Sequence, residues 1–260
     1  MAVIMFSGER PGPNSVAGLT GWWRSEFGVY SDAGTTLAVD NDTVQQWNDF
    51  SGNSYTMSQA TSTNRPTFKT NIVEGKPVVR FDGADNYMQG VDAVPNTLWA
   101  VNGATMMVAA FVHAVTTANA TAYLNDSLWT DRRAAGGVRR AHALTTAPTA
   151  TAFSYDGSED AAAESATVTA AWLSFTYMHD GINVYSGVSD TRTASMTSAA
   201  SGSTTALADR HLIFGANTDL SIFTQVDIAE IVAFNVALTE ANRQIVERYF
   251  AAKYGITLPY

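Results

Sequence analysis

The sequence predicts an all-β domain that ends in one short α-helix. Turn signals rich in glycine, asparagine and aspartate recur between residues 18 and 90, and the stretches between them have the length of strands. Charged residues make up only 15% of the chain, while threonine, serine, alanine and glycine are plentiful, which suits packed sheets joined by many turns. Near the C-terminus, a strand pattern passes directly into an amphipathic helical pattern.

Residues 1–14 are expected to form an N-terminal arm, separate from a single domain over residues 15–260. Residues 3–6 are apolar, and Pro11-Gly12-Pro13 interrupts the chain before the domain begins. Two interpretations stay open. The arm is either a first strand at a sheet edge or a frayed end, or it is a docking arm that anchors the domain to a neighbouring subunit.

Short strands are predicted in order along the rest of the chain. Turn signals stand at residues 31–34, 48–49, 51–53 and 82–83. Residues 105–115 are continuously apolar and predict a buried strand. The later segments are a hairpin at 130–140 around Gly136-Gly137, a polar acidic connection at 156–165, two strands at 171–188 joined by His179-Asp180-Gly181, a Ser/Thr/Ala-rich loop at 189–209 and a strand at 210–216.

The C-terminal strand and helix have the clearest patterns. Simple alternation places Val226, Ile228, Glu230, Val232 and Phe234 on one side of the strand and the residues between them on the other. The helix pattern starts at a capping threonine, carries an apolar stripe at i, i+4 spacing, and ends on a lysine and a glycine. These residues are Thr239, Ile245 with Tyr249, Val246 with Phe250, Lys253 and Gly255.

Five motifs occur in an order that is similar to one known family. They are Gly21-Trp22-Trp23, residues 44–53, residues 64–66, residues 75–83 and the strand–helix ending. The chain thereby resembles the concanavalin A-like, laminin-G-like domains of the short bacterial and phage type, from about residue 16 to about residue 258. The resemblance implies a two-sheet antiparallel jelly-roll sandwich whose core includes Trp22 or Trp23, Trp47 and Trp172. It implies binding of carbohydrate or protein more often than catalysis.

Composition excludes several classes of function. The 24 acidic and 15 basic residues give a net charge of −9, so a nucleic-acid partner is not expected. The absence of cysteine excludes disulfides and zinc–thiolate sites. The apolar run at residues 106–115 is too short for membrane insertion, and residues 1–10 lack the pattern of a secretion signal. With the resemblance, this predicts synthesis in the cytoplasm and a place on the virion surface.

The carboxylates do not predict an enzyme. The Glu-x-Asp-x-x-Glu strand that glycanases of this fold usually carry is absent, and Glu159, Asp160 and Glu164 fall in a segment without alternation. Glu230 is expected to be partly buried in an ion pair, with Arg80 as the first partner and Arg243 or Arg248 as others.

Asp82 and Asp85, beside Asn86, form a candidate calcium site at the rim of the sandwich, where the resembling domains often bind this ion. Two carboxylates are too few for a full set of oxygen ligands, so the alternative is a simple turn at Asp82-Gly83. No other cofactor is expected. The four histidines are isolated in sequence, and His113 is expected to be a core residue.

Two groups of residues are candidates for contact with a glycan or partner. Trp129 and Tyr155 lie beside turn signals, and exposed aromatic rings can stack on sugars. The arginines around the predicted hairpin make a positive spot suited to anionic glycans or an acidic protein surface, or else a solvated hairpin paired with aspartates. They are Arg132, Arg133, Arg139 and Arg140.

The sequence therefore predicts a non-catalytic phage virion-surface protein, a capsid decoration or fibre component, whose lectin-like domain binds glycan or a neighbouring capsid or tail subunit. A cellular carbohydrate-binding module and a glycan hydrolase or lyase are the alternatives. Because a lone copy of such a domain binds sugar weakly, we expect a homo-oligomer or multivalent display.

Overall fold

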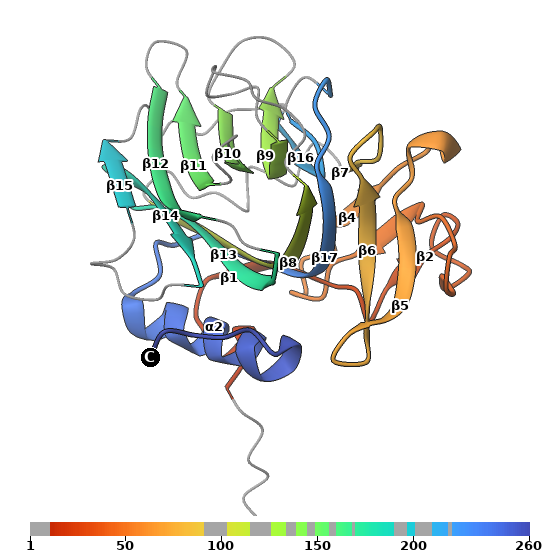
Figure 1. Cartoon of the computed structure of the whole chain (residues 1–260), viewed down its shortest axis with the longest axis horizontal. Coiled ribbons are helices and arrows are strands. Elements are labelled where there is room, and N and C mark those ends of the chain that lie inside the picture. Colours follow the sequence, from red (N-terminus) through yellow and green to blue (C-terminus); the bar gives the residue numbers. More distant parts are fainter. Residues whose placement is uncertain are drawn as a thin grey trace, which may run out of the picture.

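The computed structural model describes residues 11–90, 103–114, 126–133, 139–144, 149–155, 160–167, 170–189, 197–200, 210–217 and 220–260. Within these residues, the strands form two antiparallel sheets, one of eight strands and one of nine. Two short 3-10 helices, η1 (Pro13–Ser15) and η2 (Ser62–Asn64), lie in the first third of the chain, and one α-helix, α2 (Glu240–Tyr254), follows the last strand (Figure 1). The predicted all-β sandwich with a C-terminal helix is confirmed.

Sheet A, the eight-stranded sheet, carries the helix. In spatial order it contains β15 (Thr197–Ala200), β14 (Asn183–Val188), β13 (Trp172–His179), β8 (Ala104–Ala114), β17 (Gln225–Phe234), β6 (Lys76–Asp82) and β5 (Thr67–Val73), and β1 (Leu19–Arg24) also pairs with β17. β17 is the central strand: β8 pairs along one edge, while β6 and β1 share the other edge.

Sheet B, the nine-stranded sheet, faces sheet A. In spatial order it contains β12 (Asp160–Thr167), β11 (Thr149–Tyr155), β10 (Arg139–Leu144), β9 (Asp126–Arg133), β16 (Arg210–Phe214), β7 (Met88–Gly90), β4 (Thr56–Ser58), β3 (Gln46–Asn48) and β2 (Val29–Tyr30). The antiparallel pairing of β9 with β10 confirms the predicted hairpin, although the turn itself lies outside the described residues.

Aromatic side chains fill the space between the two sheets. Trp23 of sheet A and Trp47 of sheet B are fully buried, and both rings meet Phe214 edge-on, at centroid distances of 5.3 and 6.1 Å. The indole N–H groups are satisfied inside the core, since Trp23 donates to Tyr55 O and Trp47 donates to Arg24 O. The expectation that these two tryptophans are core residues is confirmed.

A β-bulge in β17 changes which residues face the core. The register with β8 shifts between Ile228 and Glu230, so Ala229 is an extra residue. Val226, Ile228 and Ile231 belong to the core between the sheets, whereas Ala229, Val232 and Phe234 pack with the helix on the outer face. The simple alternation predicted for this strand is therefore wrong, because one extra residue moves every later side chain to the opposite face.

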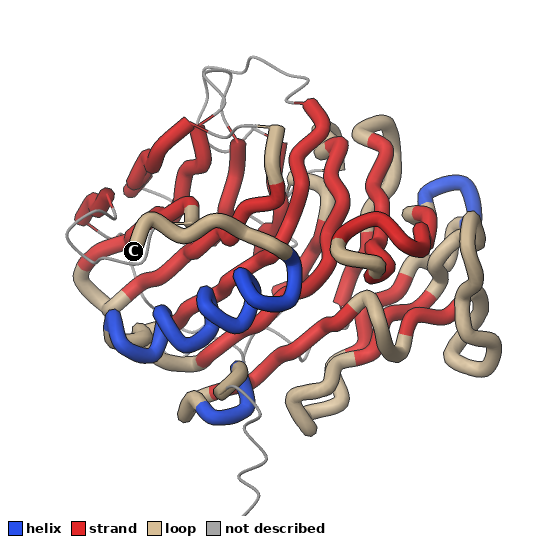
Figure 2. The backbone as a smooth tube through the Cα atoms, turned by 60° about the horizontal axis from the view of Figure 1, so that its bottom comes forward, coloured by secondary structure: helices blue, strands red, loops and turns tan. Residues whose placement is uncertain are grey.

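Helix α2 covers part of the outer face of sheet A (Figure 2). Val246 and Phe250 are fully buried there against Met107 and Val232. Thr239 caps the helix by accepting a hydrogen bond from Asn242 N at 3.3 Å, as predicted. Gly255 ends it with φ of 65°, and the remaining residues run back beside the helix. Among the described residues, no helix is long and apolar enough to span a membrane.

Two segments predicted as irregular contain strands. Residues 160–165 of the predicted acidic connection lie in β12, and β15 lies within the predicted loop at 189–209. Each is at one end of its sheet, where pairing with β11 or β14 supplies the strand conformation. The predicted strands at 105–115, 171–188 and 210–216 are confirmed as β8, as β13 with β14, and as β16. Residues 1–10 of the arm lie outside the described residues.

Candidate functional site

The backbone brings five of the six predicted glycan-contact residues to one end of sheet B. Arg132 and Arg133 end β9, and their Cα partners on β16 are His211 and Arg210. Arg140 is opposite Asp131, and Arg139 is opposite Tyr155 at the end of β11. Trp129 lies further along β9, opposite His142 and Phe214. Arg210 is an additional cation of this group that the sequence analysis missed. The binding role of these residues stays a prediction.

Asp82 and Asp85 lie in the turn after β6. Asp82 Oδ1 accepts hydrogen bonds from the backbone N–H groups of Ala84, Asp85 and Asn86 at 2.9 to 3.4 Å, and Asp85 Oδ1 accepts from Asn86 Nδ2 at 3.2 Å. These contacts build the turn that was the alternative interpretation. Within the described part of the chain, no group of three carboxylate, histidine or cysteine side chains lies close enough to hold a metal ion. The calcium site stays a prediction.

Glu230 is fully buried between β17 and α2, but its partner is not the one expected. Lys253 Nζ lies 2.6 Å from Glu230 Oε2 and also contacts Glu26. Tyr254 donates to Glu230 Oε2 at 2.5 Å, and the Trp22 indole donates to Oε1. The prediction that Arg80 pairs with Glu230 is wrong, because the register between β6 and β17 places Arg80 opposite Asp227. The contacts of Glu230 are those of a structural ion pair that ties the helix to the sheet.

A row of aromatic and charged side chains crosses sheet A beside the area that α2 covers. Trp172 of β13 is opposite Phe111 of β8, Phe111 is opposite Asp227 of β17, and Asp227 is opposite Arg80 of β6. Directly opposed residues share a face. Because Ala110 and Val112 point into the core between the sheets, Phe111 and His113 point outward. We call Trp172, Phe111, His113, Arg80 and Asp227 the Trp172 surface.

The aromatic part of the Trp172 surface is partly open to solvent. Phe111 and Trp172 are half-buried, with ring centroids 6.0 Å apart, and His113 is an exposed residue 4.9 Å from the Phe111 ring. The Trp172 indole stacks on Tyr254 of α2 at 6.5 Å with an interplanar angle of 22°. This stacking holds the orientation of the indole. Because Trp172 is half-buried and His113 is exposed, the expectation that each of them is a core residue is wrong.

The polar part of the Trp172 surface is an ordered ion pair. Arg80 Nε and Nη2 each lie 2.6 Å from an Asp227 carboxylate oxygen, and His113 Nε2 lies 3.1 Å from Asp227 Oδ2. The hydrogen bonds to Asp227 raise the pKa of Arg80 above its ordinary value. Asp227 is only 2% exposed, whereas 34% of the Arg80 side chain is open to solvent. Asp227 thus fixes a guanidinium that still has N–H donors beyond the two it uses here.

A pocket of about 420 Å³ adjoins Trp172 at the C-terminal end of the helix. Tyr254, Ile72 and Leu173 give it apolar walls, and Glu74 and Thr257 add a carboxylate and a hydroxyl group. Glu74 stands in the turn between β5 and β6 with φ of 46°, beside Gly75. Its carboxylate lies so close to Gly255 that a Cβ there would be only 2.9 Å from Oε1. An aromatic wall with a few polar groups is the usual composition of a small-molecule site.

Sequence reasoning missed the Trp172 surface because its residues come from four separate strands. One signal was available in the sequence: Phe111 and His113 alternate with smaller apolar residues in a run that was interpreted as wholly buried. Alternation of this kind is typical of a strand with one exposed face.

The comparisons with known proteins support the fold. No family model matches the sequence, and no curated protein matches it. The chain is similar in structure to the binding domain of botulinum neurotoxin DC in complex with SialylT, with a TM-score of 0.57 at 8% identity, covering 90% of this chain and 51% of that one. It is also similar to Trypanosoma rangeli sialidase in complex with sialic acid, with a TM-score of 0.57 at 11% identity, covering 92% and 33%.

A third similar structure is a GH54 α-L-arabinofuranosidase, with a TM-score of 0.57 at 10% identity, covering 82% of this chain and 51% of that one. The chain thus spans about half or one third of the length of these proteins. At such identities, the likeness shows a shared β-sandwich fold alone. The finer resemblance to the bacterial and phage type of laminin-G-like domain stays a prediction.

Proposed function

We propose that this chain is a non-catalytic, lectin-like domain that binds glycan at the Trp172 surface. The observation that carries the proposal is the row across sheet A, in which a half-buried tryptophan, a phenylalanine and an anchored arginine share one outward face. Aromatic rings offer an apolar face to a pyranose ring, and the N–H donors of Arg80 that do not bind Asp227 suit its hydroxyl or carboxylate oxygens.

Preorganisation of the Trp172 surface supports the proposal. Trp172 is held by Tyr254 and Phe111, and Arg80 is held by Asp227, so little side-chain entropy is lost when a ligand binds. Two of the similar structures were solved with sialic acid or SialylT, and another bears a title that refers to two ganglioside molecules. These ligands belong to those proteins, and they guide the choice of glycans to test here.

We also propose that the domain is displayed in several copies on a phage virion, where it contacts glycan or a capsid or tail subunit. This placement rests on the resemblance between the sequence and phage laminin-G-like domains. Weak single-site binding becomes effective when several copies engage one surface. Detection of the chain by antibody in density-purified phage particles tests this placement. Particles that do not contain the chain contradict the placement.

The glycan proposal is tested by screening the full chain on a glycan array and measuring the best ligand by calorimetry. Trp172→Ala should weaken that affinity at least about tenfold, because truncation of an aromatic anchor typically costs more than about 1.4 kcal/mol. Phe50→Ala is a matched control, since Phe50 is an aromatic residue that is 43% exposed outside this surface. This control should bind as the original chain does.

Two outcomes would contradict the proposal. If Trp129→Ala combined with Tyr155→Ala abolishes binding while Trp172→Ala does not, the ligand occupies the end of sheet B. If the pure chain releases new reducing ends from the bound glycan, the domain is an enzyme.

The variant Arg80→Gln separates sugar classes. A large loss of affinity for anionic glycans alone indicates a charge contact, whereas an equal loss of affinity for neutral glycans indicates recognition of hydroxyl groups.

A further inference from the structure

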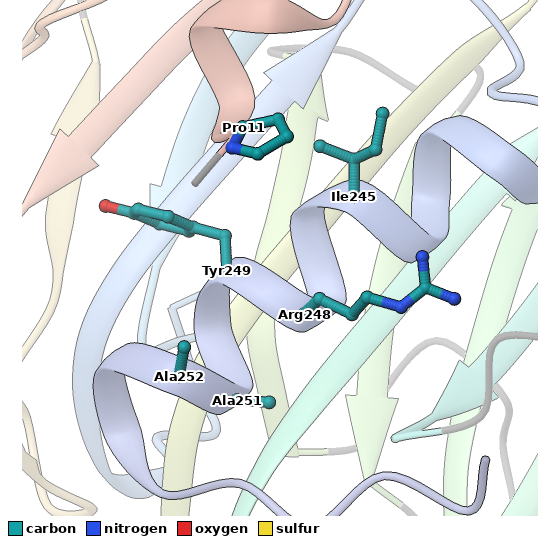
Figure 3. A pocket seen from close by; sticks show the side chains of 6 residues that line it. All are labelled: Pro11, Ile245, Arg248, Tyr249, Ala251 and Ala252. Atoms are coloured by element: carbon teal, nitrogen blue, oxygen red, sulfur yellow. The ribbon is translucent and has the colours of Figure 1, made fainter. Parts of the chain in front are cut away.

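An apolar groove runs along the solvent side of α2 (Figure 3). It has a volume of about 410 Å³ and is lined by Pro11, Ile245, Arg248, Tyr249, Ala251 and Ala252. In Figure 3, Pro11 and the side chain of Ile245 lie above the Tyr249 ring, while the Arg248 guanidinium extends away from them. Val246 and Phe250 pack against sheet A, and Ile245, Tyr249 and Ala251 of the lining are half-buried at the edge of that contact. The groove shares no residue with the Trp172 surface.

The chain enters the domain at this groove. Pro11 is the first described residue and is itself part of the lining. Gly12 passes so close to the Tyr249 ring that a Cβ at Gly12 would lie 3.3 Å from Tyr249 Cδ2. The following turn is locked, because Ser15 N and Ser15 Oγ both donate to Gly12 O, at 2.9 and 2.7 Å. The ten residues before Pro11 therefore start from a fixed point at the mouth of the groove.

We propose that the groove is the docking site of the chain's own N-terminal segment, residues 3–6. This segment, Val-Ile-Met-Phe, is the apolar part of the arm. It supplies four apolar side chains for a groove whose walls are mainly apolar, and the charge of Glu9 is opposite in sign to that of Arg248 in the lining. The proposal assigns the arm to the body of the same molecule, rather than to a neighbouring subunit.

The length of the arm permits this contact. Four residues lie between Phe6 and Pro11, and the five Cα-to-Cα steps of this stretch span at most about 17 Å when the chain is extended. The part of the helix that lines the groove runs from Ile245 to Ala252, eight residues whose seven rises cover about 10 Å along the helix axis. The chain between Pro11 and residues 3–6 is therefore long enough for these residues to reach the groove of their own molecule. Tethering gives the segment a local concentration in the millimolar range, far above that of a second copy in dilute solution.

Cysteine pairing tests the proposal directly, because the chain contains no cysteine of its own. Ala252→Cys, at an exposed position of the lining, is combined in turn with Val3→Cys, Ile4→Cys, Met5→Cys and Phe6→Cys. Each full-length variant is oxidised at low concentration with oxidised glutathione. At least one pair should close into an intrachain disulfide, seen as a faster monomer band without reductant and a mass loss of two hydrogens. The bond requires the two Cα atoms to approach within about 7 Å.

The control combines the same four arm cysteines with Thr61→Cys, an exposed residue in the loop between β4 and β5. These pairs should close at least tenfold more slowly. Disulfide-linked dimers in place of closed monomers would overturn the proposal in favour of a second copy. Closure no faster than with Thr61→Cys for all four pairs would also overturn it.

A second measurement uses no introduced cysteine. Ile4→Ser combined with Phe6→Ser should release the segment and uncover the groove, so the fluorescence of an apolar dye such as anilinonaphthalene sulfonate should rise severalfold. Ser7→Ala changes a polar position of the same arm that has no part in the proposed contact, and it should leave the dye signal within twofold of the original chain. An equal signal from all three proteins contradicts the docking.

Discussion

At the scale of single residues, the buried carboxylate of Glu230 depends on one cation and two hydroxyl groups that the C-terminal helix supplies. Its side chain has no exposed area, and Lys253 is only 10% exposed. Tyr254 and Tyr249 donate to the same Oε2 atom, at 2.5 and 3.3 Å. A buried carboxylate with this set of donors is stable only while the helix is docked, so these residues couple helix and sheet.

Lys253→Met should lower the free energy of unfolding by about 3–5 kcal/mol, because it leaves the Glu230 charge buried without its cation. Urea unfolding followed by tryptophan fluorescence measures the change. Adding Glu230→Gln to this variant removes the unpaired charge and should restore part of the loss. A loss below about 1 kcal/mol for Lys253→Met alone would show that the pair behaves like an exposed one.

The sequence predicted that Glu230 is buried and paired, yet it pointed to the wrong partner. Burial follows from the apolar neighbours of Glu230 in the strand, which is local information. The partner depends on the bulge at Ala229 and on the register that brings Arg80 opposite Asp227. A bulge adds one residue without a distinctive residue type, so alternation alone cannot show where it occurs.

At the scale of elements, α2 is the part of the fold that the sequence specifies most completely. Its cap, its apolar stripe and its final glycine were all predicted, because each is a contact between residues a few positions apart. Gly255 has φ of 65°, a conformation that glycine adopts at little cost. In contrast, β12 and β15 lack strand alternation, and their conformation comes from pairing with the preceding strands, β11 and β14.

Thr239→Ala should destabilise the domain by about 1 kcal/mol, because the N–H of Asn242 loses its side-chain acceptor at the start of α2. Thr239→Ser retains the hydroxyl group and should stay within a few tenths of a kcal/mol of the original chain. Thermal unfolding of the three proteins in parallel measures the difference. Equal destabilisation by alanine and serine would show that the methyl group, rather than the cap, matters here.

At the scale of the whole molecule, the candidate site exists only because the sheet is assembled. Arg80, Phe111, Trp172 and Asp227 are dispersed along the chain, and one register across β6, β17, β8 and β13 aligns them. Composition and motifs were sufficient to predict the sandwich and its helix. They were insufficient to predict the Trp172 surface, because a shift of one residue in any of these strand pairings would turn a side chain to the opposite face.

The docked helix also gives the whole domain a predictable response to alkaline pH. Burial, together with the nearby Glu230 charge, raises the pKa values of Tyr249 and Tyr254 well above the ordinary tyrosine value. In the unfolded chain, both phenols ionise near pH 10. Below about pH 10, both states keep these protons, so the tyrosines add no pH dependence to stability there. Above it, the unfolded chain binds fewer protons, so the free energy of unfolding falls as pH rises.

We expect this fall to approach about 1.4 kcal/mol per pH unit for each tyrosine, measured by urea unfolding in steps from about pH 8 to pH 12. Tyr254→Phe should reduce the slope by about one proton, although it also lowers stability at every pH because its hydrogen bond to Glu230 is lost. Trp22→Phe is the matched control, since it removes another donor to Glu230 without removing a titrating proton. It should lower the whole curve and keep the slope. If Tyr254→Phe leaves the alkaline slope of the original chain, the phenol at the helix–sheet contact is not the group that titrates on unfolding.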